Sequence, residues 1–301
     1  AGGVLTQLLG WESIFLVQAP LALLPLAALP GLRAPRVPAP AGRPHGAANV
    51  ALLLVSGALA AALFLLVILL VDGWRLQPAA AGLAVTAMPA AAIASARLAP
   101  RLGGAAVRAA AGAILAGGGL AALGLLPAAA VAWTVPPQLL VGAGLGLTLA
   151  ALTERALTGS APQAIHGGWT IASRHAGVVL GLLLLTPVFT AALDRNQDDA
   201  LAAGTAAVID ARVPPLDKLR LAQDVLAQVD RADGRMPDVG AAFAERLEGE
   251  DADAYRALQA ELEDELDRAA TNAFSSSFLL SALLALAALV PIGLARGGVS
   301  V

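Results

Sequence analysis

The stretch TIASRHAGVVLGLLLLTPVFT, which spans Thr170–Thr190, places Arg174 and His175 at the start of a long apolar run. In a water-soluble core both side chains would need buried partners, whereas at the edge of a lipid bilayer they face water and phosphate. About 20 apolar residues form a helix long enough to cross a bilayer. The stretch therefore predicts a membrane-spanning helix that begins at the membrane surface.

The whole chain shares this apolar character. Of its 301 residues, 58% are hydrophobic and only 14% are charged, and the mean hydropathy is +0.75. Soluble domains have about 45–50% apolar and about 25% charged residues, so the composition is that of a membrane protein. Aromatic residues make up only 4%, and the abundant small and aliphatic residues favour closely packed helices over a barrel. Because cysteine is absent, disulfides, thiolate metal sites and cysteine nucleophiles are excluded.

Hydropathy over windows of membrane length predicts seven spans. The first contains three prolines, which membrane helices tolerate when neighbouring helices satisfy the freed carbonyl groups. The predicted spans are Ile14–Leu32, Asn49–Val71, Pro78–Ala99, Ala105–Val131, Val135–Leu157, Ile171–Leu193 and Ala273–Ala295. The expected fold is an all-α, polytopic membrane helical bundle.

Positive charges in the connections predict how the chain is oriented in the membrane. Short cytoplasmic loops carry an excess of Lys and Arg, and here arginines occur in every second connection. They are Arg33, Arg36 and Arg43, then Arg97, Arg101 and Arg108, then Arg155 and Arg174, and finally Arg296. The alternate connections hold Asp72 with Arg75, then no charge, then an acidic segment. This pattern predicts a multi-pass plasma-membrane protein whose first residues lie outside and whose C-terminus lies in the cytoplasm.

Residues 194–271, called the acidic cap below, differ from the rest of the chain. They hold 19 of the 22 acidic residues but only 9 of the 19 basic ones. Apolar side chains recur there at helical spacing, as at Tyr255, Leu258 and Leu262. We expect an extracytoplasmic cap of two to four helices, and a solvated, partly disordered loop is the alternative. Its carboxylates have no pocket or histidine partner in the pattern, so no catalytic role is expected.

Polar side chains at membrane depth are candidates for a substrate pathway, because their burial without a partner is costly. Ser56 lies on the second span, and Gln138 and Thr148 lie on the fifth. Glu154, near the cytoplasmic end of the fifth span, either belongs to this pathway or forms a local ion pair or a surface anchor. No carboxylate lies in the middle of a span.

Cationic and titratable side chains mark the cytoplasmic ends of several spans. They are Arg97, Arg101, Arg155, Arg174 and His175. Long cationic side chains at such positions reach lipid phosphate, so we expect anchoring. A role in gating or in steering the substrate is the alternative.

Glycines in the fifth and sixth spans permit two interpretations. The segment VGAGLGL, residues 141–147, contains Gly142 and Gly146, but no strand precedes it and no Lys-Ser/Thr follows, so a nucleotide-binding loop is not supported. Small residues at helical spacing let membrane helices approach closely. Gly142 with Gly146, and Gly177 with Gly181, are therefore expected to pack helices together.

Five stretches taken in order resemble one known family. They are GGVLTQLLGWESIFLVQAPLALL (residues 2–24), LQPAAAGLAVTAMPAA (76–91), ARLAPRLGG (96–104), PQLLVGAGLGL (137–147) and IASRHAGVVLGLLLLTPVF (171–189). In this order they resemble the end of the fifth and the sixth helix, the start of the eighth, the loop that follows it, and the tenth and eleventh helices of major facilitator superfamily transporters, in their drug:proton antiporter branch. Pro100 replaces the acidic residue usual in the loop.

The resemblance implies a twelve-helix, two-bundle transporter that alternates between inward and outward openings. The parts would be the end of the fifth helix and the sixth helix (1–32), a cytoplasmic linker (33–48), helices seven to eleven (49–193), the acidic cap (194–271), and the last helix with a short tail (272–301). Helices seven and ten line the cavity of such transporters, so Asn49–Val71 and Val135–Leu157 would form its walls. The first five helices of the same protein are expected to precede the chain.

The function implied by the resemblance is proton-coupled multidrug efflux of small amphipathic or cationic compounds, with no enzymatic activity. No cofactor or metal is expected, since the proton gradient would supply the energy, and no nucleic-acid partner is expected. The expected partners are the lipid bilayer, the substrate and the preceding helices. The preference for Arg over Lys, with Lys218 as the sole lysine, and the wealth of Ala suggest a bacterial source.

Two other classes of function fit parts of the pattern. Seven spans with the first residues outside also suit a receptor or sensor, although the short tail after Arg296 leaves little room for a cytoplasmic signalling segment. A membrane protein whose acidic cap binds an extracytoplasmic partner is the other alternative. Transport assays with and without the cap would separate these classes.

Overall fold

The computed structural model describes residues 2–24, 45–158, 163–211, 213–232, 239–244, 246–248 and 252–294. All regular structure in these residues is helical, and they contain no strand, which confirms the predicted all-α class. Three short elements are tighter or wider turns: η2 is a π-helix, and η3 and η4 are 3-10 helices. In chain order the elements are α1 Gly2–Leu9, α2 Ser13–Leu23, α3 Gly46–Ile68, η2 Leu69–Gly73, α4 Pro78–Ala84, α5 Ala87–Leu98, η3 Ala99–Arg101, α6 Ala105–Leu123, α7 Val131–Leu157, α8 Gln163–Asp210, α9 Pro215–Ala232, α10 Gly240–Phe243, η4 Arg246–Glu248, α11 Ala252–Ala287 and α12 Leu289–Leu294.

Six helical stretches within the described residues are long and apolar enough to cross a membrane. Their outward surface is also apolar, since Leu183 is 65% exposed and Ile93 is 55% exposed. A continuous apolar surface of this kind is unfavourable in water and favourable in lipid, so the molecule is a membrane-embedded helical bundle. The six stretches are Gly46–Gly73, Pro78–Arg101, Ala105–Leu123, Val131–Leu157, Ala164–Leu193 and Ala252–Leu294. Each overlaps one of the second to seventh predicted spans, although α8 begins at Gln163, before the predicted start at Ile171, and α11 begins at Ala252, before the predicted start at Ala273.

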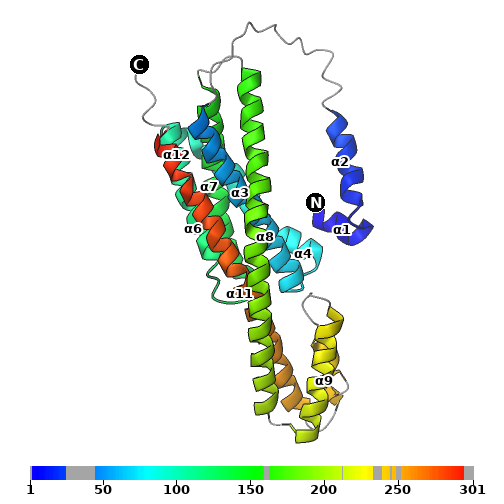
Figure 1. Cartoon of the computed structure of the whole chain (residues 1–301). Coiled ribbons are helices and arrows are strands. Elements are labelled where there is room, and N and C mark those ends of the chain that lie inside the picture. Colours follow the sequence, from blue (N-terminus) through cyan, green and yellow to red (C-terminus); the bar gives the residue numbers. More distant parts are fainter. Residues whose placement is uncertain are drawn as a thin grey trace.

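The first predicted span, Ile14–Leu32, is described only as far as Leu24. Its described part is α2, which is 11 residues long and contains Pro20. α1 and α2 stand beside the bundle, where α1 packs on α4 (Figure 1). The remainder of this predicted span, and the predicted linker at 33–44, lie outside the described residues.

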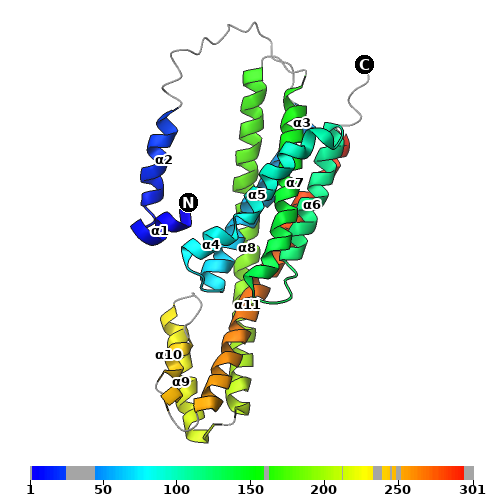
Figure 2. The same cartoon turned by 180° about the vertical axis from the view of Figure 1, so that it is seen from behind.

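Successive spanning helices run in opposite directions (Figures 1 and 2). α3 packs along α8, α5 along α7, α6 along α7, and α11 along both α6 and α8. The last turns of α5 and α7, which carry Arg97 and Arg155, therefore lie at the same end of the bundle as the first turn of α3. The acidic cap projects from the opposite end.

The third predicted span is divided into two helices. α4 ends at Ala84 and α5 begins at Ala87, and the Thr86 hydroxyl donates to the Leu83 carbonyl oxygen at 2.5 Å across the break. Pro89 follows three residues later, and a proline cannot donate the backbone hydrogen bond that would continue the first helix. Residues on both sides of the break, such as Gly82 and Pro89, line a space between this span and its neighbours.

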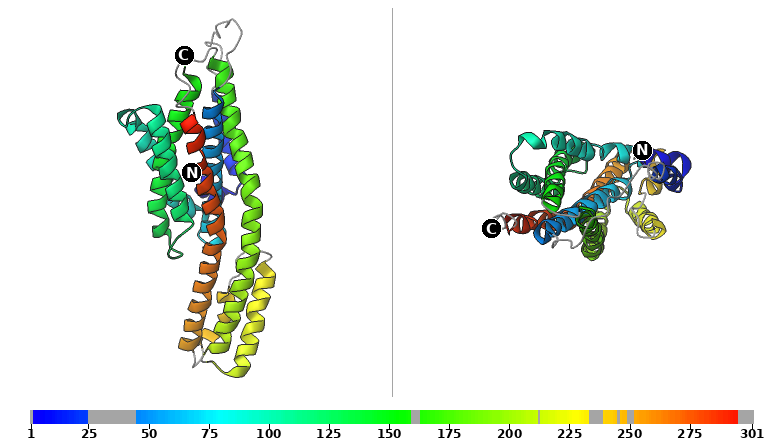
Figure 3. Two further views of the ribbon diagram at one scale, coloured as in Figure 1. Left: turned by 60° about the vertical axis from the view of Figure 1, so that its left-hand side comes forward. Right: turned by 90° about the horizontal axis from the view of Figure 1, so that it is seen from above.

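α8 and α11 pass from the membrane bundle into the acidic cap without interruption (Figure 3). α8 is 48 residues long and α11 is 36 residues long, so the predicted boundaries at 193/194 and 271/272 lie inside helices. Hydropathy marks where the solvent changes, but the backbone hydrogen-bond ladder does not stop there.

The acidic cap has an apolar core of its own. α9, α10 and the outer parts of α8 and α11 surround it, and Phe243 and Leu221 are fully buried in it. The buried members of this core are Val208, Val213, Leu221, Ala242, Phe243, Tyr255, Leu258 and Leu262. The described part of the acidic cap is thus a small helical subdomain built on two helices of the bundle.

Candidate functional site

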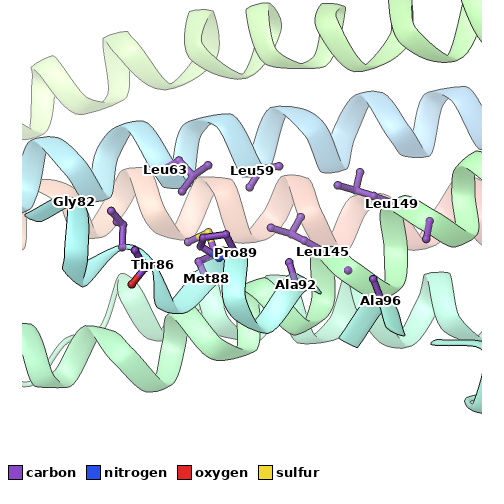
Figure 4. Close-up of a pocket in the computed structure, with 13 residues that line it drawn as sticks. Leu59, Leu63, Gly82, Thr86, Met88, Pro89, Ala92, Ala96, Leu145 and Leu149 are labelled. Carbon is purple, nitrogen blue, oxygen red and sulfur yellow. The ribbon is translucent and has the colours of Figure 1, made fainter. Parts of the chain in front are cut away.

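An apolar cavity lies between α3, α4–α5 and α7 (Figure 4). Its volume is about 540 Å³, which is within the range of about 300–1,000 Å³ typical of small-molecule sites. Leu59 and Leu63 reach it from α3, while Leu145 and Leu149 reach it from α7. The described residues that line it are Leu59, Leu63, Gly82, Val85, Thr86, Met88, Pro89, Ala92, Ala96, Leu145, Gly146, Leu149 and Ala150.

The chemistry of this lining is almost wholly apolar. None of the described lining residues is charged. Thr86 contributes a hydroxyl group to the lining, and that hydroxyl already donates a hydrogen bond to the Leu83 carbonyl oxygen. Met88 adds a polarizable thioether that adapts to irregular shapes. The cavity can therefore hold an apolar group of about the size of a small organic molecule, and its walls give that group few directional contacts.

Close contact between α5 and α7 forms the closed side of the cavity. Gly142 lies directly against the Met88 carbonyl oxygen, and Gly146 lies against the Ala92 carbonyl oxygen, so that a Cβ at either glycine would overlap the α5 backbone. Helices that touch through their backbones leave the larger side chains to line the space beside the contact. The cavity thus lies next to the α5–α7 contact and extends toward α3.

A second seam of small residues joins α3 to α8. A Cβ on Gly181 would lie 2.6 Å from the Gly57 carbonyl oxygen, and a Cβ on Gly177 would overlap the carbonyl oxygen of Leu53. Side chains do not tolerate such distances, so both positions require the hydrogen of glycine. The structure therefore places all four of the predicted packing glycines at helix–helix contacts.

The polar residues expected to form a pathway do not line this cavity. Thr148 faces α6, where its hydroxyl lies 2.8 Å from the Gly144 carbonyl oxygen and 3.4 Å from that of Ala109. Gln138 is fully buried on α7 and donates from Nε2 to the Thr134 hydroxyl at 2.9 Å. Ser56 is 4% exposed on α3. The structure does not bring these three side chains to the apolar cavity.

Two of these buried groups lack a hydrogen-bond partner among the described residues. They are the Ser56 hydroxyl and the Gln138 side-chain carbonyl oxygen, Oε1. A buried polar atom without a partner costs free energy, so each one calls for an explanation such as a bound water or ion. Gln138 therefore remains a candidate for binding a polar group, at a place separate from the cavity.

Glu154 forms an ion pair across the α6–α7 contact. Its Oε2 accepts a hydrogen bond from Arg108 Nη2 at 2.6 Å, and the Arg108 side chain is 11% exposed. A partly buried, charge-assisted pair of this kind fixes two helices relative to each other. The structure thus gives Glu154 an ion-pair partner on α6.

The predicted cytoplasmic cations lie on the surface of the molecule. Arg97, Arg101, Arg174 and His175 are exposed, and Arg155 is half-buried. Arg97 and Arg101 are at the end of the α5–η3 segment, and Arg155 is in the last turn of α7. The shared position of Arg97, Arg101 and Arg155 is compatible with contact to lipid phosphate at one face of the membrane, whereas Arg174 and His175 follow the start of α8 at Gln163 by about three turns.

His166, near the start of α8, is a buried titratable residue that we did not predict as a site. It is 2% exposed, and neither ring nitrogen has a hydrogen-bond partner among the described residues. Asn49, near the start of α3, likewise has a buried and unpartnered side-chain oxygen. The helical spacing of His166 with Thr170 and Gly177 places it on the face of α8 that packs on α3, and this signal was present in the sequence.

Trp74 and Arg75, which follow the π-helical turn at the end of α3 nearest the acidic cap, contact α11. Trp74 is only 8% exposed, and its indole nitrogen donates to the Thr271 hydroxyl at 3.0 Å. Arg75 Nη2 lies 3.4 Å from Asp267 Oδ1. Trp74 is therefore packed within the protein, although its position in the sequence also suits a tryptophan of the membrane interface.

Within the described parts of the chain, no group of three His, Asp or Glu residues is placed to hold a metal ion. No protein-family model matches the chain, and no curated protein matches it. The function is therefore inferred from the cavity, the helix contacts and the distribution of charge.

Proposed function

We propose that this chain is part of a membrane secondary transporter that exports small amphipathic or cationic compounds in exchange for protons. The observation that carries the proposal is the apolar cavity of about 540 Å³ within a bundle of membrane-spanning helices. A cavity between spans provides a binding place at membrane depth, where secondary transporters bind their substrates. The order of stretches that resembles the drug:proton antiporter branch of the major facilitator superfamily also supports it.

The helix contacts suit the motion that alternating access requires. The α5–α7 and α3–α8 contacts place glycines against backbone carbonyl groups, beside larger buried side chains such as Met88 on α5 and Leu185 on α8. Because these close contacts hold its helices together, the bundle would move as a unit against a partner bundle.

The cavity chemistry favours the apolar portion of an amphipathic substrate. Since no described lining residue is charged, a cationic head group would find its counter-charge elsewhere in the complete transporter. We therefore propose that the described cavity binds the hydrophobic body of the substrate.

Transport by the complete protein in proteoliposomes, with and without an imposed proton gradient, tests the proposal. We expect export of lipophilic cations and neutral amphiphiles to accelerate when the gradient is present. Flux that is absent, or that ignores the gradient, would contradict proton antiport.

A matched pair of variants tests the cavity. Ala92→Phe on α5 fills the cavity, and we expect it to weaken substrate transport about tenfold or more, which corresponds to about 1.4 kcal/mol of lost binding. Ala94→Phe adds the same side chain at an exposed position on the same helix and should leave transport within about twofold of the wild type. Equal effects of the two changes would show that the cavity is not the binding place.

A further inference from the structure

The outer end of α3 has an unusual backbone. α3 widens into the π-helical turn Leu69–Gly73, and the chain then turns at Trp74 and Arg75. Arg75 has φ of 55°, which makes it the sole non-glycine residue with positive φ in the described parts of the chain. A left-handed conformation is unfavourable for a residue with a side chain, so it persists when surrounding contacts hold it in place.

The hydrogen bonds of Trp74 and the ion pair of Arg75 are made with α11 or with the π-helical turn itself. The Trp74 indole donates to the Thr271 hydroxyl, which in turn donates to the Asp267 carbonyl oxygen at 2.7 Å. Arg75, the next residue, pairs with the Asp267 carboxylate. Because Asp267 and Thr271 are four residues apart, they lie one above the other on a single face of α11. The turn thus directs two consecutive side chains to one turn of α11.

Asp267 has more acidic than basic neighbours that affect its pKa. Burial raises the pKa of its carboxyl group above 3.8, and the nearby Glu263 and Asp264 raise the pKa further. Arg75 opposes this increase without cancelling it. On α11 itself Arg268 pairs with Asp264 and Glu265. On α8, which packs against α11, the Arg195 guanidinium donates a hydrogen bond to the Ala191 carbonyl oxygen.

The contact of Trp74 and Arg75 with α11, called the junction below, connects the acidic cap with one wall of the cavity. Asp267 lies just before the apolar part of α11, where the acidic cap meets the membrane bundle. Arg75 follows the helix that supplies Leu59 and Leu63 to the cavity. A change at the junction therefore acts at once on the acidic cap and on one wall of the cavity.

We propose that Asp267 is a proton-binding site on the extracytoplasmic side, and that its protonation releases Arg75 and loosens the outer end of α3 from α11. This inference rests on the transport function proposed above, and it names a carboxylate through which external protons act on the cavity. The proton comes from the external water and binds to a carboxylate oxygen of Asp267. Arg75 then loses its counter-charge, and the contact that offsets its left-handed backbone conformation is lost.

Fluorescence of Trp74 tests the proton site without any transport. In the complete protein, every tryptophan other than Trp74 is replaced by phenylalanine, and the emission is followed between about pH 3 and pH 8. We expect a single transition with a midpoint above 3.8, the ordinary pKa of aspartate. Asp267→Asn should abolish the transition, and Arg75→Gln should move it to higher pH because the opposing charge is gone.

The matched control is Asp253→Asn, which removes a carboxylate that is 98% exposed at the start of α11. It should leave the transition unchanged. A transition that persists in Asp267→Asn, or one that Arg75→Gln fails to raise, would overturn the proposal. A signal that does not change with pH in the wild type would also overturn it.

Transport by the same variants separates this inference from the proposed function. The wild-type rate should vary with external pH by up to about tenfold per pH unit, as for one titrating group. Asp267→Asn should flatten this profile, while Asp253→Asn should retain it. Gradient-driven transport that keeps its profile in Asp267→Asn would refute the proton site and leave the antiporter standing. Transport that does not depend on the proton gradient would refute antiport. The pH titration of Trp74 fluorescence would then still test whether Asp267 binds the proton.

Discussion

The membrane bundle and the acidic cap use the same helices but are held together in different ways. In the bundle, α8 meets α3 through Gly177 and Gly181, and backbone lies against backbone. In the acidic cap, α8 and α11 meet α9 and α10 through larger apolar side chains such as Phe243 and Leu258, and charged residues cover the outside. In the membrane bundle, close backbone contacts at glycines therefore accompany buried apolar side chains such as Leu52 and Phe278, whereas the core of the acidic cap is built from apolar side chains.

The solvent explains this difference. In water, burial of large apolar side chains stabilises a fold by about 25 cal/mol for each Å² removed from solvent. In lipid, exposed and buried aliphatic side chains have similar surroundings, so close approach and dispersion contacts hold helices together. One continuous helix such as α8 must satisfy both conditions at different points along its length.

The largest expected effect comes from adding a side chain to the α3–α8 seam. Gly177→Leu forces α8 away from the α3 backbone, and we expect it to destabilise the bundle by more than about 4 kcal/mol, a range reserved for disrupted cores. Thermal unfolding of the detergent-purified protein measures the change. Gly168→Leu on the same helix is the control, because a Cβ at Gly168 meets no atom within 4 Å. If the two variants unfolded alike, glycine packing would not be what holds the bundle.

A smaller effect is expected when a side chain is removed from the core of the acidic cap. Phe243 is fully buried there, and Phe243→Ala should cost about 3 kcal/mol, at the low end for such truncations because α10 is short and able to relax. Hydrogen exchange should show faster exchange in α9 and the outer turns of α11 with little change in α6 and α7. Uniform loss of protection would mean that the acidic cap and the bundle unfold as one unit.

The sequence predicted the membrane helices well because their signal is strong. Lipid requires each span to satisfy its own backbone and to expose apolar side chains, and both demands leave long uncharged runs such as Ala51–Val71. The packing glycines were also predictable, since Gly142 with Gly146 and Gly177 with Gly181 follow helical spacing. These features depend on local sequence.

The cavity and the outer junction could not be predicted in the same way. The cavity depends on the break at Val85–Thr86 and on how three helices are spaced, and residues such as Ala92 and Leu59 are ordinary in any span. We expected polar residues to form the substrate pathway, yet the Thr148 hydroxyl forms its hydrogen bonds within the α6–α7 contact. Arg75 and Asp267 are 192 residues apart, and no local pattern pairs them.

The smallest expected effect concerns the point where the two regions meet. Burial raises the pKa of Asp267 in the folded protein above its value of 3.8 in the unfolded chain, so the folded state binds this proton more tightly. The contribution to stability is therefore present at low pH and is lost as pH rises through the folded pKa. Asp267→Asn resembles the protonated residue at every pH. We expect its melting temperature to match that of the wild type at low pH and to exceed it slightly at neutral pH. The difference should develop as the pH rises above 3.8, and Asp253→Asn should show no such dependence. If Asp267→Asn were less stable at neutral pH, the attraction of Arg75 would outweigh burial, and the junction would belong with the ordinary ion pairs of the acidic cap.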